Sequence, residues 1–144
     1  MRTLLAILAT LALTALSATV LGDGRAGYVV IVNASNPVTA VDREFLAAAF
    51  LKKTTTWSNG DVIHPVDLAP GSPVRRQFTD EVLHRSIPEV KGYWQQRIFS
   101  GRDVPPPELD TDDDVTQYVI KHSGAVGYVS SGAPLGSVKP VAVR

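Results

Sequence analysis

One stretch, residues 62–83, constrains the fold more than any other, because it predicts a strand, a tight loop and a helix in direct succession. Apolar, β-branched residues open the stretch, and Pro70 and Gly71 then break the strand pattern. Ser72 stands at the position of a helix N-cap, with Pro73 at the first helical position. The apolar residues that follow recur every fourth position, which predicts one buried helical face. These residues are Val74, Phe78 and Val82.

The start of this helix also has the chemistry of an anion site. Free backbone N–H groups in a first helical turn and the positive end of the helix dipole attract an anion. Arg75 and Arg76 follow Ser72 in the same turn and add positive charge. Phosphate or sulfate is the expected ligand. The same residues also fit a helix start that binds nothing, in which Arg76 pairs with Asp80 four residues later.

Residues 1–22 have the layout of a secretory signal peptide. Arg2 precedes an apolar run from Leu4 to Leu21, and small residues lie near its end. The run also meets the lower length limit for a membrane-spanning helix, so a retained anchor is the alternative. We expect cleavage, because the run is rich in Ala and Thr and no basic stop-transfer cluster follows it. Cleavage after Ala18 or after Gly22 fits this layout; the second would leave a mature chain of residues 23–144, in the periplasm or outside the cell.

Composition excludes several classes of function. A mature chain of this length provides one hydrophobic core, so we expect one domain. The formal net charge is zero, which predicts neither a nucleic-acid surface nor an anionic-membrane surface. The sequence contains no cysteine, and this excludes disulfides, thiolate metal sites and cysteine nucleophiles.

Nothing in the sequence predicts catalysis or a cofactor. The three histidines are scattered, and no two of them have the i, i+4 spacing of a helical metal site. Ser72 lacks the second glycine of a hydrolase nucleophile elbow, and no histidine and acid are positioned by sequence to activate it. We therefore expect a protein that is not an enzyme and has no metal and no cofactor.

Strand and helix patterns alternate along the rest of the chain. Residues 28–32 and 125–129 are continuous apolar runs, typical of strands buried on both faces, and the first should be central. Residues 138–143 predict a strand at a sheet edge or with a bulge, because Pro140 lies inside it. Helices are predicted from a cap at Thr39 and Asp42 to Phe50, from Pro88 through Ile98, and from a cap at Thr111 to Gly124. This alternation predicts an α/β domain with a mixed or mainly parallel sheet and helices on its faces.

Apolar residues near four-residue spacing predict which faces of these three helices are buried. The expected buried residues are Val41, Phe45 and Ala49 in the first helix, Val90, Trp94 and Ile98 in the second, and Val115, Val119 and Ile120 in the third.

Five segments together resemble a known family. They are VVIVNASNP (29–37), VDREFLAAAFLKKTTTWSNG (41–60), SPVRRQFTDEVL (72–83), YWQQRIFSG (93–101) and GAVGYVS (124–130). Their order and spacing resemble the short, single-lobe relatives of the phosphate-type periplasmic binding proteins of bacterial ABC importers. The resemblance implies one periplasmic-binding-protein-like lobe over residues 23–144, which binds a solute and performs no catalysis.

The resemblance also implies a site and its partners. In full-length relatives the ligand is held between two lobes by hydroxyls and backbone N–H groups at helix starts. Ser72 matches the serine of their Ser-Gly-Thr motif, whereas Pro73 and Val74 replace the glycine and threonine. The expected ligand-binding residues are Ser35, Asn36, Ser72, Arg75 and Arg76.

The expected ligand is phosphate or a similar small anion. The expected macromolecular partner is the membrane component of an ABC importer, with a second lobe or protomer to cover the ligand, and no nucleic acid. The alternative is an accessory or interaction module of the cell envelope, built on the same lobe, that has lost solute binding.

Overall fold

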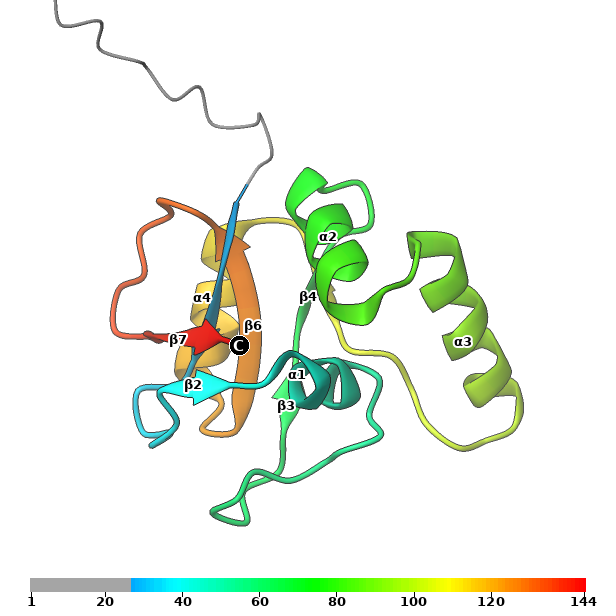
Figure 1. The fold of residues 1–144 in the computed structure, drawn as a ribbon, viewed down its shortest axis with the longest axis horizontal. Coiled ribbons are helices and arrows are strands. Elements are labelled where there is room, and N and C mark those ends of the chain that lie inside the picture. Colours follow the sequence, from blue (N-terminus) through cyan, green and yellow to red (C-terminus); the bar gives the residue numbers. More distant parts are fainter. Residues whose placement is uncertain (1–26) are drawn as a thin grey trace, which may run out of the picture.

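The computed structural model describes residues 27–144 (Figure 1), so the predicted signal peptide lies outside the described residues. The strands are β1 (Tyr28–Val32), β2 (Ala40–Val41), β3 (His64–Pro65), β4 (Asp67–Leu68), β5 (Glu108–Leu109), β6 (Ala125–Ser130) and β7 (Lys139–Val143). The helices are α1 (Arg43–Phe50), α2 (Pro73–Phe78), which continues into a π-helical segment η1 (Thr79–Leu83), α3 (Ile87–Phe99) and α4 (Asp112–Lys121). Among these helices, none has both the length and the apolar character needed to cross a membrane.

The main sheet is mixed, as predicted, with the strand order β2-β7-β1-β6-β3. β1 lies at its centre and pairs antiparallel with both β6 and β7. The outer pairs, β2 with β7 and β3 with β6, are parallel. β4 and β5 form a separate parallel pair. The apolar run of β1 predicted this central position correctly, because a strand with neighbours on both edges needs apolar residues on both faces.

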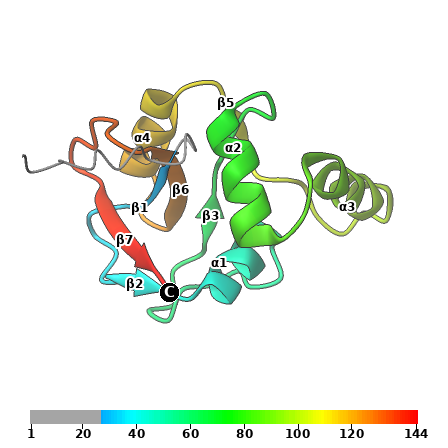
Figure 2. The same cartoon turned by 45° about the horizontal axis from the view of Figure 1, so that its top comes forward.

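Helices cover both faces of the sheet (Figures 1 and 2). Successive residues of β6 point to opposite faces. Tyr128 stacks on Phe78 of α2, with ring centroids 3.9 Å apart. Gly127 faces α4, where an added Cβ would lie 2.8 Å from the side chains of Val115 and Val66. The glycine therefore allows α4 to lie close to the sheet, and the α/β prediction is confirmed.

The predicted caps located the starts of α2 and α4 correctly, and Pro88 located the start of α3 to within one residue. The hydroxyls of Ser72 and Thr111 accept hydrogen bonds from the N–H groups three residues later, at 3.2 and 3.1 Å, and begin α2 and α4. α3 begins at Ile87, one residue before the predicted Pro88. Its N-cap is Ser86, and the Glu89 side chain completes a capping box.

The predicted start of the first helix is wrong. Ala40 and Val41 form β2, which pairs with β7, and α1 begins only at Arg43. Asp42 is the N-cap, but its side chain makes no capping hydrogen bond. Long-range pairing with the C-terminal strand thus takes precedence over the local capping pattern of residues 39–42. The buried face of α1 consists of Leu46, Ala49 and Phe50.

Two predicted core residues are exposed. The exposed fraction is 52% for Ile98 and 36% for Ile120. Ile120 lies one position beyond the buried Val119, so it points about 100° away around the helix. Ile98 lies beyond Trp94, the last buried residue of α3.

Pro140 occupies a locally unpaired edge of β7. It pairs with Ile31 of β1 on one side. On the other side, β2 reaches only Ala142 and Val143. The missing N–H group of proline is tolerated at such a position, so the prediction of an edge holds locally although β7 lies inside the sheet.

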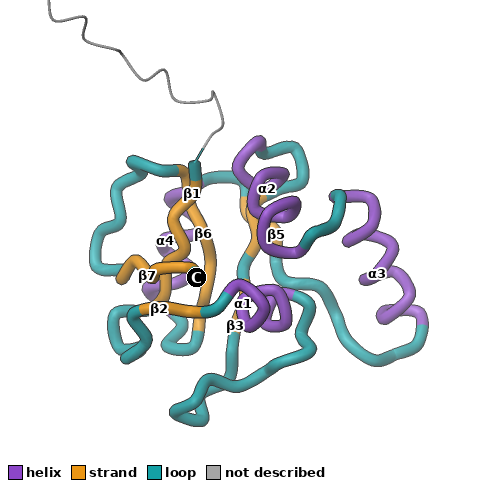
Figure 3. Tube along the Cα trace, viewed as in Figure 1, coloured by secondary structure: helices purple, strands orange, loops and turns teal. Residues whose placement is uncertain are grey.

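α3 stands to one side of the sheet, joined to η1 by the short connector of residues 84–86 and to β5 by the longer connector of residues 100–107 (Figures 2 and 3). Val90 and Trp94 are its buried residues. The hydroxyl of Tyr93 donates a hydrogen bond of 2.7 Å to the carbonyl oxygen of Leu51, which follows α1. α3 is therefore held to the lobe through one face of its middle turns, and its C-terminal end projects away.

Candidate functional site

The loop before α2 presents polar groups at a helix start. Ser72 is half-buried; its N–H group donates to the carbonyl of Ala69 at 2.9 Å, and its Oγ accepts from the N–H group of Arg75. The hydroxyl hydrogen of Ser72 donates to no acceptor among residues 27–144. The backbone N–H groups of Gly71 and Val74 likewise lack an acceptor within the described chain. Together these groups supply one O–H and two N–H donors at the positive end of a helix dipole.

Arg76 adds an exposed positive charge beside this loop. Its side chain is solvent-exposed. The pairing with Asp80 that the sequence allowed is not formed in the structure, since neither residue takes part in an ion pair within the described residues. The guanidinium of Arg76 is thus available to a solute, and an Arg guanidinium binds oxyanions through directed, charge-assisted hydrogen bonds.

Arg75, in contrast, is engaged inside the lobe. Its exposed fraction is only 5%. Nη1 donates to the carbonyl of Leu68 at 2.7 Å and to the carboxylate of Glu108 at 2.9 Å, and Nε donates to Thr79 Oγ1 at 3.2 Å. These bonds join the end of β4, the beginning of β5 and the helix itself. The charge of Arg75 therefore supports the loop and is largely neutralised before any solute arrives.

A buried carboxylate lies beneath the same loop. Asp67 accepts a hydrogen bond of 2.6 Å from the Tyr128 hydroxyl, and its Oδ1 lies 3.4 Å from Nε of Arg75. Burial raises the pKa of Asp67 to about 6, although the charge of Arg75 and the Tyr128 hydrogen bond act in the opposite direction. Burial, with Asp67 beside it, also raises the pKa of Tyr128.

Our sequence analysis missed this network of Asp67, Arg75, Glu108 and Tyr128. The available signal was an aspartate inside an apolar strand run, because a charge in such a position needs a partner.

Ser35 and Asn36 lie elsewhere. Ser35 hydrogen-bonds through its N–H and Oγ to the side chain of Asn33, at 2.9 and 2.8 Å. Asn36 is buried; its side chain accepts from Val38 N–H at 3.0 Å, and its carbonyl accepts from the Lys139 ammonium group. Both residues follow the C-terminal end of β1.

The topology separates these two residues from the loop at Ser72. β1 runs antiparallel to β6, whereas β3, which leads into β4, runs parallel to β6. The loop after β1 and the loop after β4 therefore lie at opposite ends of the sheet (Figure 1). The structure brings Ser72, Arg75 and Arg76 together, and it does not bring Ser35 and Asn36 to them.

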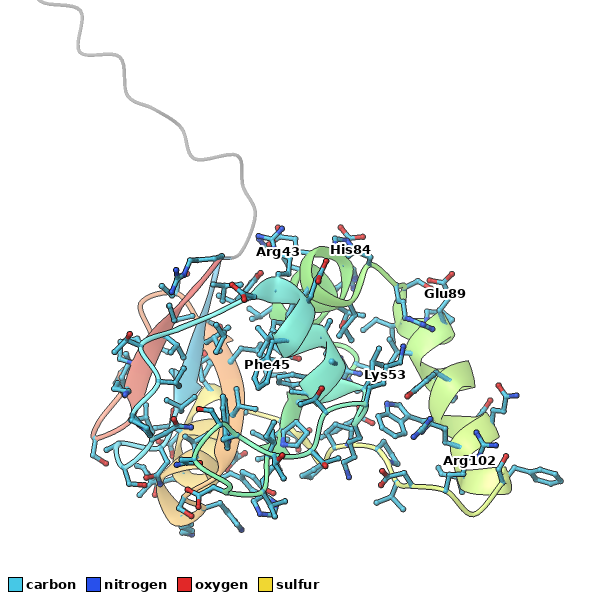
Figure 4. All side chains as sticks on the ribbon, turned by 60° about the horizontal axis from the view of Figure 1, so that its bottom comes forward. Arg43, Phe45, Lys53, His84, Glu89 and Arg102 are labelled. Atoms are coloured by element: carbon cyan, nitrogen blue, oxygen red, sulfur yellow. The ribbon has the colours of Figure 1, made fainter. Side chains whose placement is uncertain are left out.

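A hollow of about 750 Å³ lies away from this loop, between α1 and the end of η1. Arg43, Lys53, His84 and Arg85 contribute to its lining, together with the acidic side chains of Asp42 and Glu44. Figure 4 shows Arg43 and His84 close together on one side of the molecule and Lys53 farther along it. This basic hollow competes with the helix start as a place for an anion. Within residues 27–144, no three His, Cys, Asp or Glu side chains form a cluster suited to a metal ion.

Comparison with protein families assigns most of the chain to one model. Residues 24–141 match a model described as a PBP superfamily domain. Among curated proteins, no sequence matches the chain significantly.

Solved structures with the same fold include two proteins that are named for phosphate transport. An ABC-type phosphate transport receptor from Vibrio cholerae has 22% identity and a TM-score of 0.64, over 82% of this chain and 46% of that one. A protein described as a phosphate ABC transporter substrate-binding protein from Clostridium perfringens, with bound phosphate, has 23% identity and a TM-score of 0.65. The match covers 82% of this chain and 45% of that one. PstS from Borrelia burgdorferi has 12% identity and a TM-score of 0.64, and the match covers 83% of this chain and 47% of that one. The chain thus has the fold of one lobe and spans less than half the length of each of these proteins.

Proposed function

The chain belongs to the PBP superfamily, and from this membership we propose that it is an exported solute-binding module that binds phosphate or a related oxyanion for ABC-type uptake. The observation that carries the proposal is the helix start at Ser72, where one hydroxyl and two backbone N–H groups are free to donate. An oxyanion needs such preorganised donors, and the helix dipole favours its negative charge. Phosphate is the preferred candidate because two proteins of the same fold are named for phosphate transport, and one of them holds bound phosphate.

In this proposal each residue of the loop has a separate role. Ser72 and the N–H groups of Gly71 and Val74 hold the oxygens of the anion, and Arg76 supplies the positive charge. Arg75 acts indirectly, because its hydrogen bonds to Leu68 and Glu108 hold the loop in place on β4 and β5. The site is open, so a second lobe or protomer would cover the ligand, and the membrane component of an importer would receive it.

The two groups of predicted site residues do not contribute equally. Ser35 and Asn36 lie at the other end of the sheet, and their polar groups bond to their own loop and to Lys139. If they bind a solute, they do so at a separate place. We propose that the module carries out no reaction and uses no cofactor, because every group assigned to the site is a hydrogen-bond donor or a fixed charge.

Two observations favour a second function, that of an accessory or interaction module that has lost solute binding. The carboxylates of Glu108 and Asp67 already neutralise Arg75. Pro73 also removes one backbone donor from the first helical turn. Both features weaken an anion site, and the oxyanion proposal therefore depends on Arg76 and on the three donors at Ser72.

A thermal-shift experiment separates these functions. Phosphate that binds only the folded protein raises its melting temperature by mass action. The change Arg76→Gln should reduce this shift, whereas Arg102→Gln, which removes another exposed arginine at the end of α3, should leave it unchanged. All comparisons need equal ionic strength, because phosphate and sulfate also stabilise proteins through exclusion from their surfaces. An equal shift in all three proteins would eliminate the helix-start site and favour the accessory module.

A further inference from the structure

α3 ends in apolar side chains that no other part of residues 27–144 covers. Phe99 has an exposed fraction of 95%, and the nearby Ile98 and Val104 have exposed fractions of 52% and 61%. Single exposed apolar residues are ordinary in proteins, but a group led by an almost fully exposed phenylalanine at the tip of a projecting helix marks an interaction surface.

The same helix borders a cavity of about 310 Å³. Lys91, Trp94, Gln95 and Ile98 line it from α3, and their spacing places them on one side of the helix. Pro105 and Pro106 line it from the connector that follows α3. A cavity of this size is at the lower end of the range that holds small molecules, so it is large enough for an aromatic ring, and Trp94 and the prolines provide apolar surface for one.

We propose that two copies of the chain form a two-fold symmetric dimer in which Phe99 of each copy enters the α3 cavity of the other. A two-fold interface must be self-complementary, and here the projecting ring and the cavity belong to the same helix. α3 has 13 residues, which makes it about 20 Å long. Antiparallel packing of the C-terminal halves of the two α3 helices, shifted by about one to two turns from full overlap, would bring Phe99 of one beside Lys91 and Gln95 of the other, at the cavity border.

The charges around these two features are complementary. Arg102 lies three residues after Phe99 and is exposed. Glu108 lines the cavity, and its side chain is 44% exposed although it pairs with Arg75. In the dimer, Arg102 of one copy approaches Glu108 of the other.

The proposed dimer goes beyond solute binding, and its existence does not depend on whether the loop at Ser72 binds an anion. Sedimentation equilibrium of the exported chain measures the dimer dissociation constant. The change Phe99→Ser should raise that constant about 30-fold, as expected for an aromatic residue at the centre of an interface. The matched control Val62→Ser removes another exposed apolar side chain, 55% exposed and outside α3 and its connectors, and should leave the constant unchanged. A protein that is monomeric at about 100 μM, or a dimer that Phe99→Ser leaves intact, would overturn the proposal.

Cross-linking tests the pairing itself, since the chain contains no cysteine. A disulfide requires the two Cα atoms to lie within about 7 Å. An oxidised mixture of the Phe99→Cys and Gln95→Cys variants should give a covalent dimer in higher yield than either variant alone. Equal yields in the mixture and in the separate proteins would show that Phe99 does not lie at the cavity of the other copy.

Discussion

The hydroxyl of Tyr128 donates a hydrogen bond of 2.6 Å to the carboxylate of Asp67, in the interior of the lobe. This bond links β6, beside the centre of the sheet, to β4, the strand that leads into the loop at Ser72. Arg75 closes the network from α2, with its Nε 3.4 Å from the same carboxylate oxygen. The loop that presents the candidate anion site therefore rests on buried polar contacts, whose strength can be measured.

Removing the Tyr128 hydroxyl should destabilise the fold. The change Tyr128→Phe leaves the ring stack on Phe78 in place but takes one donor from a buried carboxylate, which costs about 1 to 3 kcal/mol. Urea denaturation at pH 7 measures the loss. Tyr118→Phe is the matched control, because Tyr118 is only partly buried. Equal losses in both variants would show that the bond to Asp67 contributes nothing specific.

The raised pKa of Asp67 predicts a pH dependence of stability. The pKa rises from 3.8 to about 6 on folding, so between these values the folded protein binds more protons than the unfolded one. The free energy of unfolding should therefore fall as the pH rises through this window, by up to about 3 kcal/mol for a shift of this size. Stability from this group is fully present below about pH 4 and is lost above about pH 6.

The variant Asp67→Asn isolates this effect, because asparagine does not titrate. The difference in unfolding free energy between wild type and variant should change across pH 4 to 7, with the wild type losing more stability on going to pH 7. A difference that stays constant over this range would show that Asp67 does not titrate there.

Phe78→Ala should destabilise the lobe by about 3 to 5 kcal/mol, the usual cost of truncating a buried phenylalanine. Phe78 is fully buried, and its ring lies 4.8 Å from that of Phe50 and 5.4 Å from that of Tyr28, in addition to its stack on Tyr128. Because small domains are marginally stable, this loss can unfold the protein. Thermal melting measures it, and a melting temperature equal to that of wild type would contradict the assigned core.

Export should remove the N-terminal apolar run. Its basic start, apolar middle and small-residue end predict a signal peptide. Mass spectrometry of the mature protein should find a first residue between Thr19 and Gly27. Recovery of the chain from a membrane fraction with Met1 intact would instead indicate a retained anchor.

The sequence predicted those parts of the fold that depend on neighbours along the chain. β1, with its continuous apolar run, and the capped starts of α2 and α4 are correct because each signal is complete within a few residues. The start of α1 was wrong because residues 40–41 pair with β7, which lies about 100 residues later.

The candidate site also combines a feature set by neighbouring residues with features set by residues far apart in the sequence. The cap at Ser72 is a local feature and was predictable. The pairing of Arg75 with Glu108 was not, since these residues are 33 positions apart and meet only through the ladder of β4 and β5. The separation of Ser35 and Asn36 from Ser72 also follows from strand order, which hydrophobic periodicity does not encode.

Calorimetric titration of the mature protein with phosphate tests the oxyanion site at Ser72. We expect saturable binding that Arg76→Gln weakens by about tenfold or more, since a hydrogen bond to a charged group contributes about 1.5 to 3 kcal/mol. Lys53→Gln, which removes a positive charge from the basic hollow beside α1, should leave the affinity unchanged. An affinity that falls with Lys53→Gln and not with Arg76→Gln, or no binding of phosphate, sulfate or simple carboxylates by the wild type, would contradict the assignment of an oxyanion site to Ser72.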